Sequence, residues 1–189
     1  ERTPEGRSIE FKRDLPGAKD SDRKEFLADV SSFANALGGD LIFGVEERDG
    51  IAAAADGVVV ASIDAAVLRL DEMIRSGISP RIVGCYSQVV AGLAKGPAVV
   101  IRIPRSWNGP HAISFQQDFR FYSRSTKGKF RMDASDVRDA VLAAGSIDDR
   151  IRLYRSERVA RIVADDTPVL LTGTKRIAIH IAPLAAFVS

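Results

Sequence analysis

The sequence has little of what a disulfide scaffold, a zinc site or a covalent catalytic site needs. It contains one cysteine, Cys85, and two histidines, His111 and His180, among 189 residues. A single thiol cannot form an internal disulfide, and two distant histidines do not supply the ligand spacing of a zinc site. No Ser/His/Asp or Cys/His arrangement is supported by spacing either. The lone cysteine favours a reducing compartment, so we expect a cytoplasmic protein with Cys85 packed as a small apolar residue.

Long apolar runs and phosphate-binding loops are also missing. No run reaches the roughly 20 apolar residues of a membrane helix, and no signal peptide is visible. No Gly-x-x-x-x-Gly-Lys-Ser/Thr loop occurs, and the pair Gly38-Gly39 precedes an apolar strand instead of opening a helix. These absences predict no membrane partner and argue against P-loop nucleotide chemistry.

The composition is that of a globular domain with an uneven charge distribution. Hydrophobic residues make up 46% and charged residues 28% of the chain. The net charge is +2, but residues 1–100 carry 12 Lys/Arg against 16 Asp/Glu and residues 101–189 carry 15 against 9. An acidic half with candidate carboxylates and a basic half suited to phosphates fit a nucleic-acid enzyme. Composition drift along a charged surface is the alternative.

The apolar periodicity predicts an α/β (α+β) fold with a mixed β-sheet and packed helices. Ser62 and the pair Asp133 and Asp136 are predicted helix caps, and Gly38-Gly39 is predicted to end the first helix. We expect Ser21 or Asp22 to cap that first helix. The passage 51–60 is predicted to be irregular. The predicted helices span 22–37, 63–76 and 134–144, and the predicted strands span 9–13, 41–45, 82–90, 98–103 and about 119–124.

A second pattern begins near Ile147, after Gly145, which we expect to end a helix. Residues 147–164 read as a further helix with five arginines between 150 and 161, and 169–171 and 177–181 read as strands. We therefore expect a domain over 1–146 and, over 147–189, the start of a further element of a longer protein.

Three glutamates from separate segments are candidate metal ligands. Glu5 and Glu10 lie five apart before and within the first predicted strand, and Glu47 follows a buried strand. Carboxylate oxygens suit Mg²⁺ or Mn²⁺, which activate water and neutralise phosphodiester charge. Alternatively, Glu10 pairs with a neighbouring lysine and the others are solvated. Lys12 shares the strand face of Glu10, so it either holds a substrate phosphate or forms an ion pair. Asn35 either contacts a ligand or bonds the backbone at the helix end.

A basic, aromatic segment lies between residues 119 and 131, which contain no acidic residue. Strand alternation predicts Arg120, Tyr122 and Arg124 on one face, with Phe119 and Phe121 turned toward the core. The cations would contact phosphates, and Tyr122 would stack on an unpaired base. A solvated hairpin is the alternative. The candidate nucleic-acid-binding residues are Lys12, Arg120, Tyr122, Arg124, Lys127 and Lys129.

The order of several short blocks resembles the Schlafen/AlbA-type DNA-binding domain family, which is widespread in bacteria and shared with the animal Schlafen proteins. The blocks, over roughly residues 5–145, are Glu5, Glu10-Phe11-Lys12, Phe33-Ala34-Asn35 with Gly38-Gly39, Gly44-Val45, Pro110-His111 and Phe121-Tyr122-Ser123-Arg124. Two positions depart from the family pattern. Ala36-Leu37 stand where a Thr usually precedes the two glycines, and Glu47 stands where nuclease members have Asp.

The resemblance implies a Schlafen-like core and nucleic-acid binding. Schlafen nucleases cleave structured RNA such as tRNA with three acidic residues, which here correspond to Glu5, Glu10 and Glu47. The first hypothesis is therefore a metal-dependent endoribonuclease that uses Mg²⁺ or Mn²⁺. The alternative is a non-catalytic DNA-binding regulatory module, and a third hypothesis is a domain that serves assembly. The sequence leaves open whether RNA or DNA is bound, and it is compatible with a homo-oligomer.

Overall fold

The structure is a computed structural model that describes residues 8–115, 118–166, 177 and 179–183. Its contacts divide the chain into two units, Glu1–Ala140 and Val141–Ser189, which are described separately. Helices and mixed sheets confirm the predicted α+β class. In the described part of the chain, no helix combines the length and apolarity that a membrane span requires.

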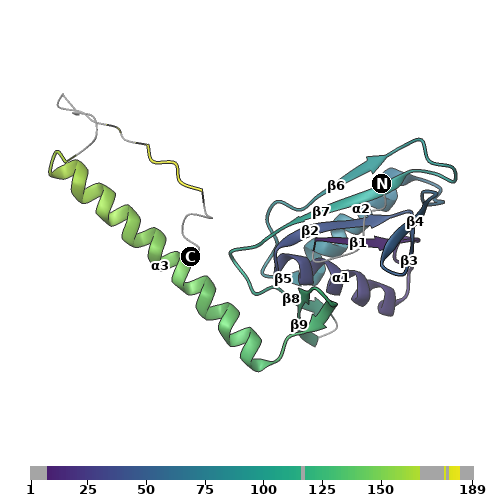
Figure 1. The fold of residues 1–189 in the computed structure, drawn as a ribbon, viewed down its shortest axis with the longest axis horizontal. Coiled ribbons are helices and arrows are strands. Elements are labelled where there is room, and N and C mark those ends of the chain that lie inside the picture. Colours follow the sequence, from purple (N-terminus) through teal and green to yellow (C-terminus); the bar gives the residue numbers. More distant parts are fainter. Residues whose placement is uncertain (1–7, 116–117, 167–176, 178, 184–189) are drawn as a thin grey trace. The chain divides into compact units, whose positions relative to one another are not determined.

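The first sheet has the strand order β1-β2-β7-β6 (Figure 1). Strand β1 (Ile9–Lys12) runs parallel to β2 (Gly38–Phe43), and β2 is antiparallel to β7 (Ala98–Pro104), which pairs in turn with the edge strand β6 (Tyr86–Val90). Glu10 lies opposite Leu41 and Lys12 opposite Phe43. Both side chains therefore share the face on which the buried Leu41 and Phe43 lie, which is the face toward the core.

The second sheet is antiparallel, in the order β10-β9-β8-β5. Its strands are β5 (Ile78–Ser79), β8 (Ala112–Phe115), β9 (Asp118–Ser125) and β10 (Gly128–Arg131). A separate hairpin joins β3 (Val45–Arg48) to β4 (Ile51–Ala55), with a register shift between Glu46 and Glu47. The prediction of an irregular 51–60 is therefore wrong for β4, and the sequence prediction also missed β3, β5, β8 and β10.

Helix α1 (Asp20–Ala34) contacts strands of both sheets. Residues 26–34 are all buried, because a helix with a sheet on either side has no solvent-facing stripe in that stretch. The predicted single apolar stripe is therefore wrong for the second half of α1. The N-cap is Lys19, without a side-chain cap bond, so neither Ser21 nor Asp22 caps the helix as predicted.

Gly38-Gly39 do not end α1, which stops at Ala34 with Asn35 as its C-cap. The pair instead opens β2, and Gly38 has φ +77°, a left-handed conformation that favours glycine. A Cβ on Gly39 would lie 2.6 Å from the Phe33 ring and 2.5 Å from the Ser8 carbonyl oxygen. The glycines are thus required by close backbone approach between α1, β1 and β2.

Helix α2 (Ile63–Gly77) begins as predicted, with the Ser62 hydroxyl accepting from the Ala65 N–H at 3.3 Å. Its residues Leu70, Met73 and Ile74 join the core formed by α1, β2 and β7. The core therefore lies between the first sheet and the helices.

Helix α3 (Ala134–Val163) begins at the predicted cap, where Asp133 accepts from the Asp136 N–H and the Asp136 carboxylate accepts from the Asp133 N–H. It continues through Gly145, so the predicted break there is wrong, and it passes from one unit into the other. The predicted strand 169–171 lies outside the described residues. Residues 177 and 179–181 have no strand structure, so the predicted strand 177–181 is wrong at those positions.

Candidate functional site

A cluster of charged side chains occupies the space between β1, α1 and the β9–β10 pair. We call it the α1 charge cluster, and its members are Glu10, Lys12, Asp29, Arg124 and Lys129. Glu10 and Lys12 come from one face of β1, and Asp29 comes from α1. Arg124 and Lys129 are cross-strand partners in β9 and β10, so they reach the helix together.

The cluster pairs every carboxylate with more than one cation. Lys12 Nζ donates to Glu10 Oε1 at 2.8 Å and lies 3.5 Å from Asp29 Oδ2. Arg124 Nη2 donates to the other oxygen, Glu10 Oε2. Lys129 Nζ donates to Asp29 Oδ1 at 2.7 Å and to Glu25 Oε1, at the rim, also at 2.7 Å. Both oxygens of Glu10 are therefore engaged by positive groups.

Burial is deepest at Asp29 and Arg124, whose side chains are each 2% exposed. The Arg124 guanidinium stacks on the Phe33 ring with 4.2 Å between Cζ and the ring centroid. Its Nη1 lies 4.0 Å from Asp29 Oδ1, and neither Nη1 nor Nε has a hydrogen-bond partner among the described residues. Glu10 and Lys129 side chains are 17% exposed and Lys12 is 32% exposed, so the cluster reaches the surface on the lysine side.

The pKa values follow from this competition between burial and pairing. Burial alone would raise the pKa of Glu10, but hydrogen bonds from Lys12 and Arg124 outweigh it and hold the pKa below the ordinary 4.5. Burial raises the pKa of Asp29, and Lys129 and Lys12 offset only part of that effect. For Lys12, burial lowers the pKa, yet Asp29 and Glu10 together raise it above 10.5. Glu10 and Lys12 are therefore an ionised pair at neutral pH.

The predicted orientation of the basic strand is wrong. Phe119 is 63% exposed, whereas Tyr122 packs against the core and Arg124 is buried. The face that carries Tyr122 and Arg124 is turned toward α1 because Arg124 neutralises carboxylates there and stacks on Phe33. Of the other predicted residues, Arg120 and Lys127 are exposed and Lys129 is half-buried.

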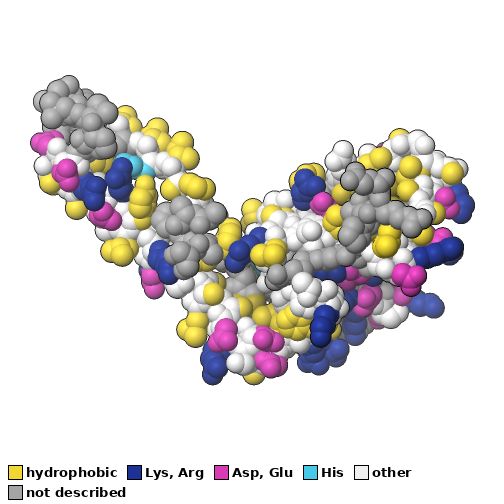
Figure 2. All heavy atoms as spheres, in the orientation of Figure 1, with side chains coloured by type: hydrophobic (Ala, Val, Ile, Leu, Met, Phe, Trp, Pro, Cys, Tyr) yellow, Lys and Arg dark blue, Asp and Glu magenta, His cyan; other side chains and the backbone are white. Residues whose placement is uncertain are grey.

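The three predicted carboxylates have different surroundings. Glu5 lies outside the described residues, and Glu10 belongs to the α1 charge cluster. Glu47 is exposed and accepts a hydrogen bond from the Gly50 N–H of its own hairpin, while Glu46 accepts from Arg48. Figure 2 shows acidic and basic side chains interspersed around this β3–β4 end of the unit. Within residues 8–115 and 118–166, no three His, Cys, Asp or Glu side chains are placed to hold a metal ion.

Sequence reasoning missed Asp29 altogether. It stands alone among apolar neighbours in Phe26-Leu27-Ala28-Asp29-Val30, and an acid in such a run needs a buried cation. That isolation was the signal that could have identified it. The Asp29 carboxylate lies within 4.0 Å of the side-chain nitrogens of Lys129, Lys12 and Arg124, so it links these three cations.

Asn35 bonds backbone groups far away in the sequence, which decides between the two predicted roles. Its amide nitrogen donates to the carbonyl oxygens of His111 and Tyr122, both at 2.9 Å, and its oxygen accepts from the His111 N–H at 2.7 Å. The His111 ring is fully buried, with Nδ1 2.6 Å from the Pro80 carbonyl oxygen. Asn35 and His111 therefore fasten β8 and β9 to the end of α1 and to the segment after β5.

Comparisons with solved structures give two low-identity neighbours. The DIP2311 protein from Corynebacterium diphtheriae is 17% identical with a TM-score of 0.46, and the match covers 67% of this chain and 25% of that one. The N-terminal domain of a RecG-related ATP-dependent DNA helicase protein from Nitrosomonas europaea is 22% identical with a TM-score of 0.40, covering 53% of this chain and 65% of that one. This chain thus spans a quarter of the first neighbour and less than two thirds of the second.

No curated protein matches the sequence. The model of the Schlafen AlbA_2 family matches residues 5–133, which include β1, α1, both sheets and the whole α1 charge cluster. That match spans more than half of the chain. The chain therefore belongs to the Schlafen AlbA_2 family, a membership that points to a nucleic-acid-related function.

Proposed function

We propose that this chain is a non-catalytic nucleic-acid-binding domain whose β9–β10 hairpin contacts phosphates. The observation that carries the proposal is the difference in burial and pairing among the hairpin cations. Arg124 forms an ion pair with Glu10, and Lys129 forms ion pairs with Asp29 and Glu25. The exposed cations Lys127 and Arg131 of the same hairpin would contact phosphates.

The two paired cations, Arg124 and Lys129, act as positioning residues in this proposal. Arg124 and Lys129 hold β9 and β10 on α1, so the hairpin is presented as a rigid surface. No acid occurs within residues 119–131, so phosphate would meet no like charge from that segment of the hairpin. Phosphate contacts of this kind give affinity that is independent of sequence and sensitive to salt.

The test is a double variant, Lys127→Ala with Arg131→Ala, assayed for oligonucleotide binding over a range of salt concentrations. Two lost contacts should reduce the slope of log affinity against log salt by about 1.8 for duplex DNA and about 1.4 for single strands. Arg48→Ala is the matched control, because Arg48 is 73% exposed and already paired with Glu46. An unchanged slope in the double variant, with the fold intact by circular dichroism, would refute the hairpin interface.

The second candidate is a metal-dependent endoribonuclease centred on Glu10. One observation favours it: Glu10 is ionised, it is 17% exposed, and the partly exposed Lys12 stands beside it. As the described side chains are arranged, an ion at Glu10 would have to displace Lys12 or Arg124. Mg²⁺ or Mn²⁺, if bound by Glu5, Glu10 and Glu47, would supply an activated water and charge neutralisation.

A cleavage assay with structured RNA, such as tRNA, in the presence of Mn²⁺ distinguishes the two candidate functions. Glu10→Gln should abolish cleavage if the site is catalytic, and Glu46→Gln is the matched control on β3. Absence of cleavage by the wild-type chain, together with salt-dependent binding, supports the binding domain. Cleavage that is lost in Glu10→Gln and retained in Glu46→Gln would instead establish the nuclease.

A further inference from the structure

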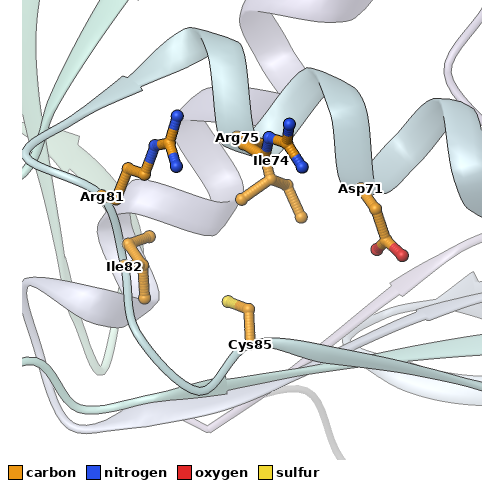
Figure 3. Close-up of a pocket in the computed structure, with 6 residues that line it drawn as sticks. All are labelled: Asp71, Ile74, Arg75, Arg81, Ile82 and Cys85. Atoms are coloured by element: carbon orange, nitrogen blue, oxygen red, sulfur yellow. The ribbon is translucent and has the colours of Figure 1, made fainter.

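A pocket of about 300 Å³ opens between helix α2 and the segment that leads into β6 (Figure 3). Its six lining residues are Asp71, Ile74, Arg75, Arg81, Ile82 and Cys85. None of them belongs to the α1 charge cluster or to the β9–β10 hairpin. The pocket is therefore a separate feature that the proposed function does not use.

The interior of the pocket is apolar and uncharged. Ile74 projects from α2 toward Cys85 on the opposite wall, and Ile82 extends the same surface (Figure 3). Burial, with a smaller effect of Asp71, raises the pKa of the Cys85 thiol to about 11. The thiol is therefore neutral at physiological pH. An apolar and uncharged pocket interior of this kind suits a flat ring.

The rim carries two arginines. The guanidinium groups of Arg75 and Arg81 lie on the same side of the pocket (Figure 3). Both residues are exposed, and in the described part of the chain neither side chain forms an ion pair or a hydrogen bond. Arg75 lies in the last turn of α2, where the helix dipole favours a cation, but Arg81 has no such structural role. Two guanidinium groups on one side of a pocket supply the positive charge and the hydrogen-bond donors that a phosphate requires.

The pocket also carries one hydrogen-bond acceptor, the Asp71 carboxylate. Its Oδ1 accepts from the Ser87 hydroxyl at 2.8 Å, which fixes the carboxylate at the end of the pocket beyond Arg75 (Figure 3). A carboxylate there requires a donor on the ligand and repels a bare anion. Asp71 therefore discriminates against inorganic phosphate and simple carboxylates.

We propose that this pocket binds a free mononucleotide whose base carries an exocyclic amino group. The ring lies between Ile74 and Cys85 and next to Ile82, the amino group donates to Asp71, and the phosphate pairs with Arg75 and Arg81. The volume is at the lower limit of pockets that hold small organic ligands, which suits a ligand as small as one nucleotide. This site is distinct from the proposed β9–β10 interface with nucleic acid, and it would give the domain a small-molecule ligand as well.

Titration calorimetry of the full chain with CMP and UMP tests the donor requirement, because the two bases differ in an amino against a carbonyl group. CMP should bind saturably and roughly tenfold or more tightly than UMP, which is the effect of one hydrogen bond to a charged group. AMP should bind like CMP, and inorganic phosphate should bind more weakly. Equal binding of CMP and UMP, or of CMP and phosphate, would overturn the proposal.

Three variants test the residues. The double variant Arg75→Ala with Arg81→Ala should weaken CMP binding more than tenfold. Asp71→Ala should remove the preference for CMP over UMP. The control Arg48→Ala should change neither the CMP affinity nor this preference. Arg75→Gln with Arg81→Gln serves as a second, shape-conserving variant. No saturable CMP or AMP binding at millimolar concentration, or binding that survives loss of both arginines, refutes the site. A double-arginine effect on oligonucleotides but not on mononucleotides also overturns it, because the pocket would then belong to a strand interface.

Discussion

Asp29→Ala should be strongly destabilising, because Asp29 holds the α1 charge cluster together. Its side chain is 2% exposed and lies 2.7 Å from Lys129 Nζ, 3.5 Å from Lys12 Nζ and 4.0 Å from Arg124 Nη1. Removing one partner of a buried ion pair costs about 3–5 kcal/mol, because the remaining charge is left buried and uncompensated. Lys129 keeps Glu25 as a partner, so we expect about 3 kcal/mol. This loss is a large part of a typical stability of roughly 5–15 kcal/mol.

The assay is urea denaturation followed by circular dichroism, with Glu25→Gln as the matched control. Glu25 binds the same lysine nitrogen at the same 2.7 Å, but its side chain is 61% exposed. An exposed pair contributes about 0–1 kcal/mol, so the control should lose less than about 1 kcal/mol. Equal losses in the two variants would refute the reasoning, because burial is the only difference that it uses. A loss below about 1 kcal/mol for Asp29→Ala would refute it as well.

Two substitutions and one pH titration test the cluster and its surroundings. Asn35→Ala removes three hydrogen bonds to the backbone of His111 and Tyr122, so the free energy of unfolding in urea should fall by about 3 kcal/mol at about 1 kcal/mol per bond. Burial would raise the pKa of Glu10, but its cation partners lower it overall, so its contribution to stability is present above pH 4.5 and is lost as pH falls through its folded value. Glu10→Gln should therefore flatten the acid limb of the stability curve, and an unchanged limb would contradict the pairing. Burial lowers the pKa of His111, so the native state loses stability as pH falls below 6.5, and its ring resonances should titrate below that value by NMR.

The elements that the sequence predicts well are those set by local chemistry. Ser62 before α2 and Asp133 with Asp136 before α3 have side chains that bond backbone groups within three residues, and both caps are found. The prediction failed where long-range packing decides. Gly38-Gly39 resemble a helix end, but a Cβ at Gly38 would meet the backbone of residues 103–105, and one at Gly39 would meet Phe33 and Ser8. No local pattern reveals these long-range contacts.

The candidate site was predictable in its members more than in its geometry. Glu10 and Lys12 share a face as strand periodicity predicts, and between the two roles considered for Lys12 the ion pair is the one observed. The face of β9 could not be predicted, because aromatic residues were expected to be buried ahead of arginine. Phe119 is exposed instead, since burying Arg124 satisfies Glu10 and stacks the guanidinium on Phe33.

This inversion changes how many contacts the hairpin can make with a nucleic acid. Counting the basic residues of 119–131 from the sequence gives five cations, which would predict a salt slope of about 4.5 for duplex DNA. Arg124 and Lys129 are held by carboxylates, so the interface proposed above rests on the exposed Lys127 and Arg131, whose expected contribution is about 1.8. A measured contribution near 4.5 would require Arg124 and Lys129 to leave Glu10 and Asp29 on binding. The salt slope therefore reports whether the α1 charge cluster stays closed when the domain binds its ligand.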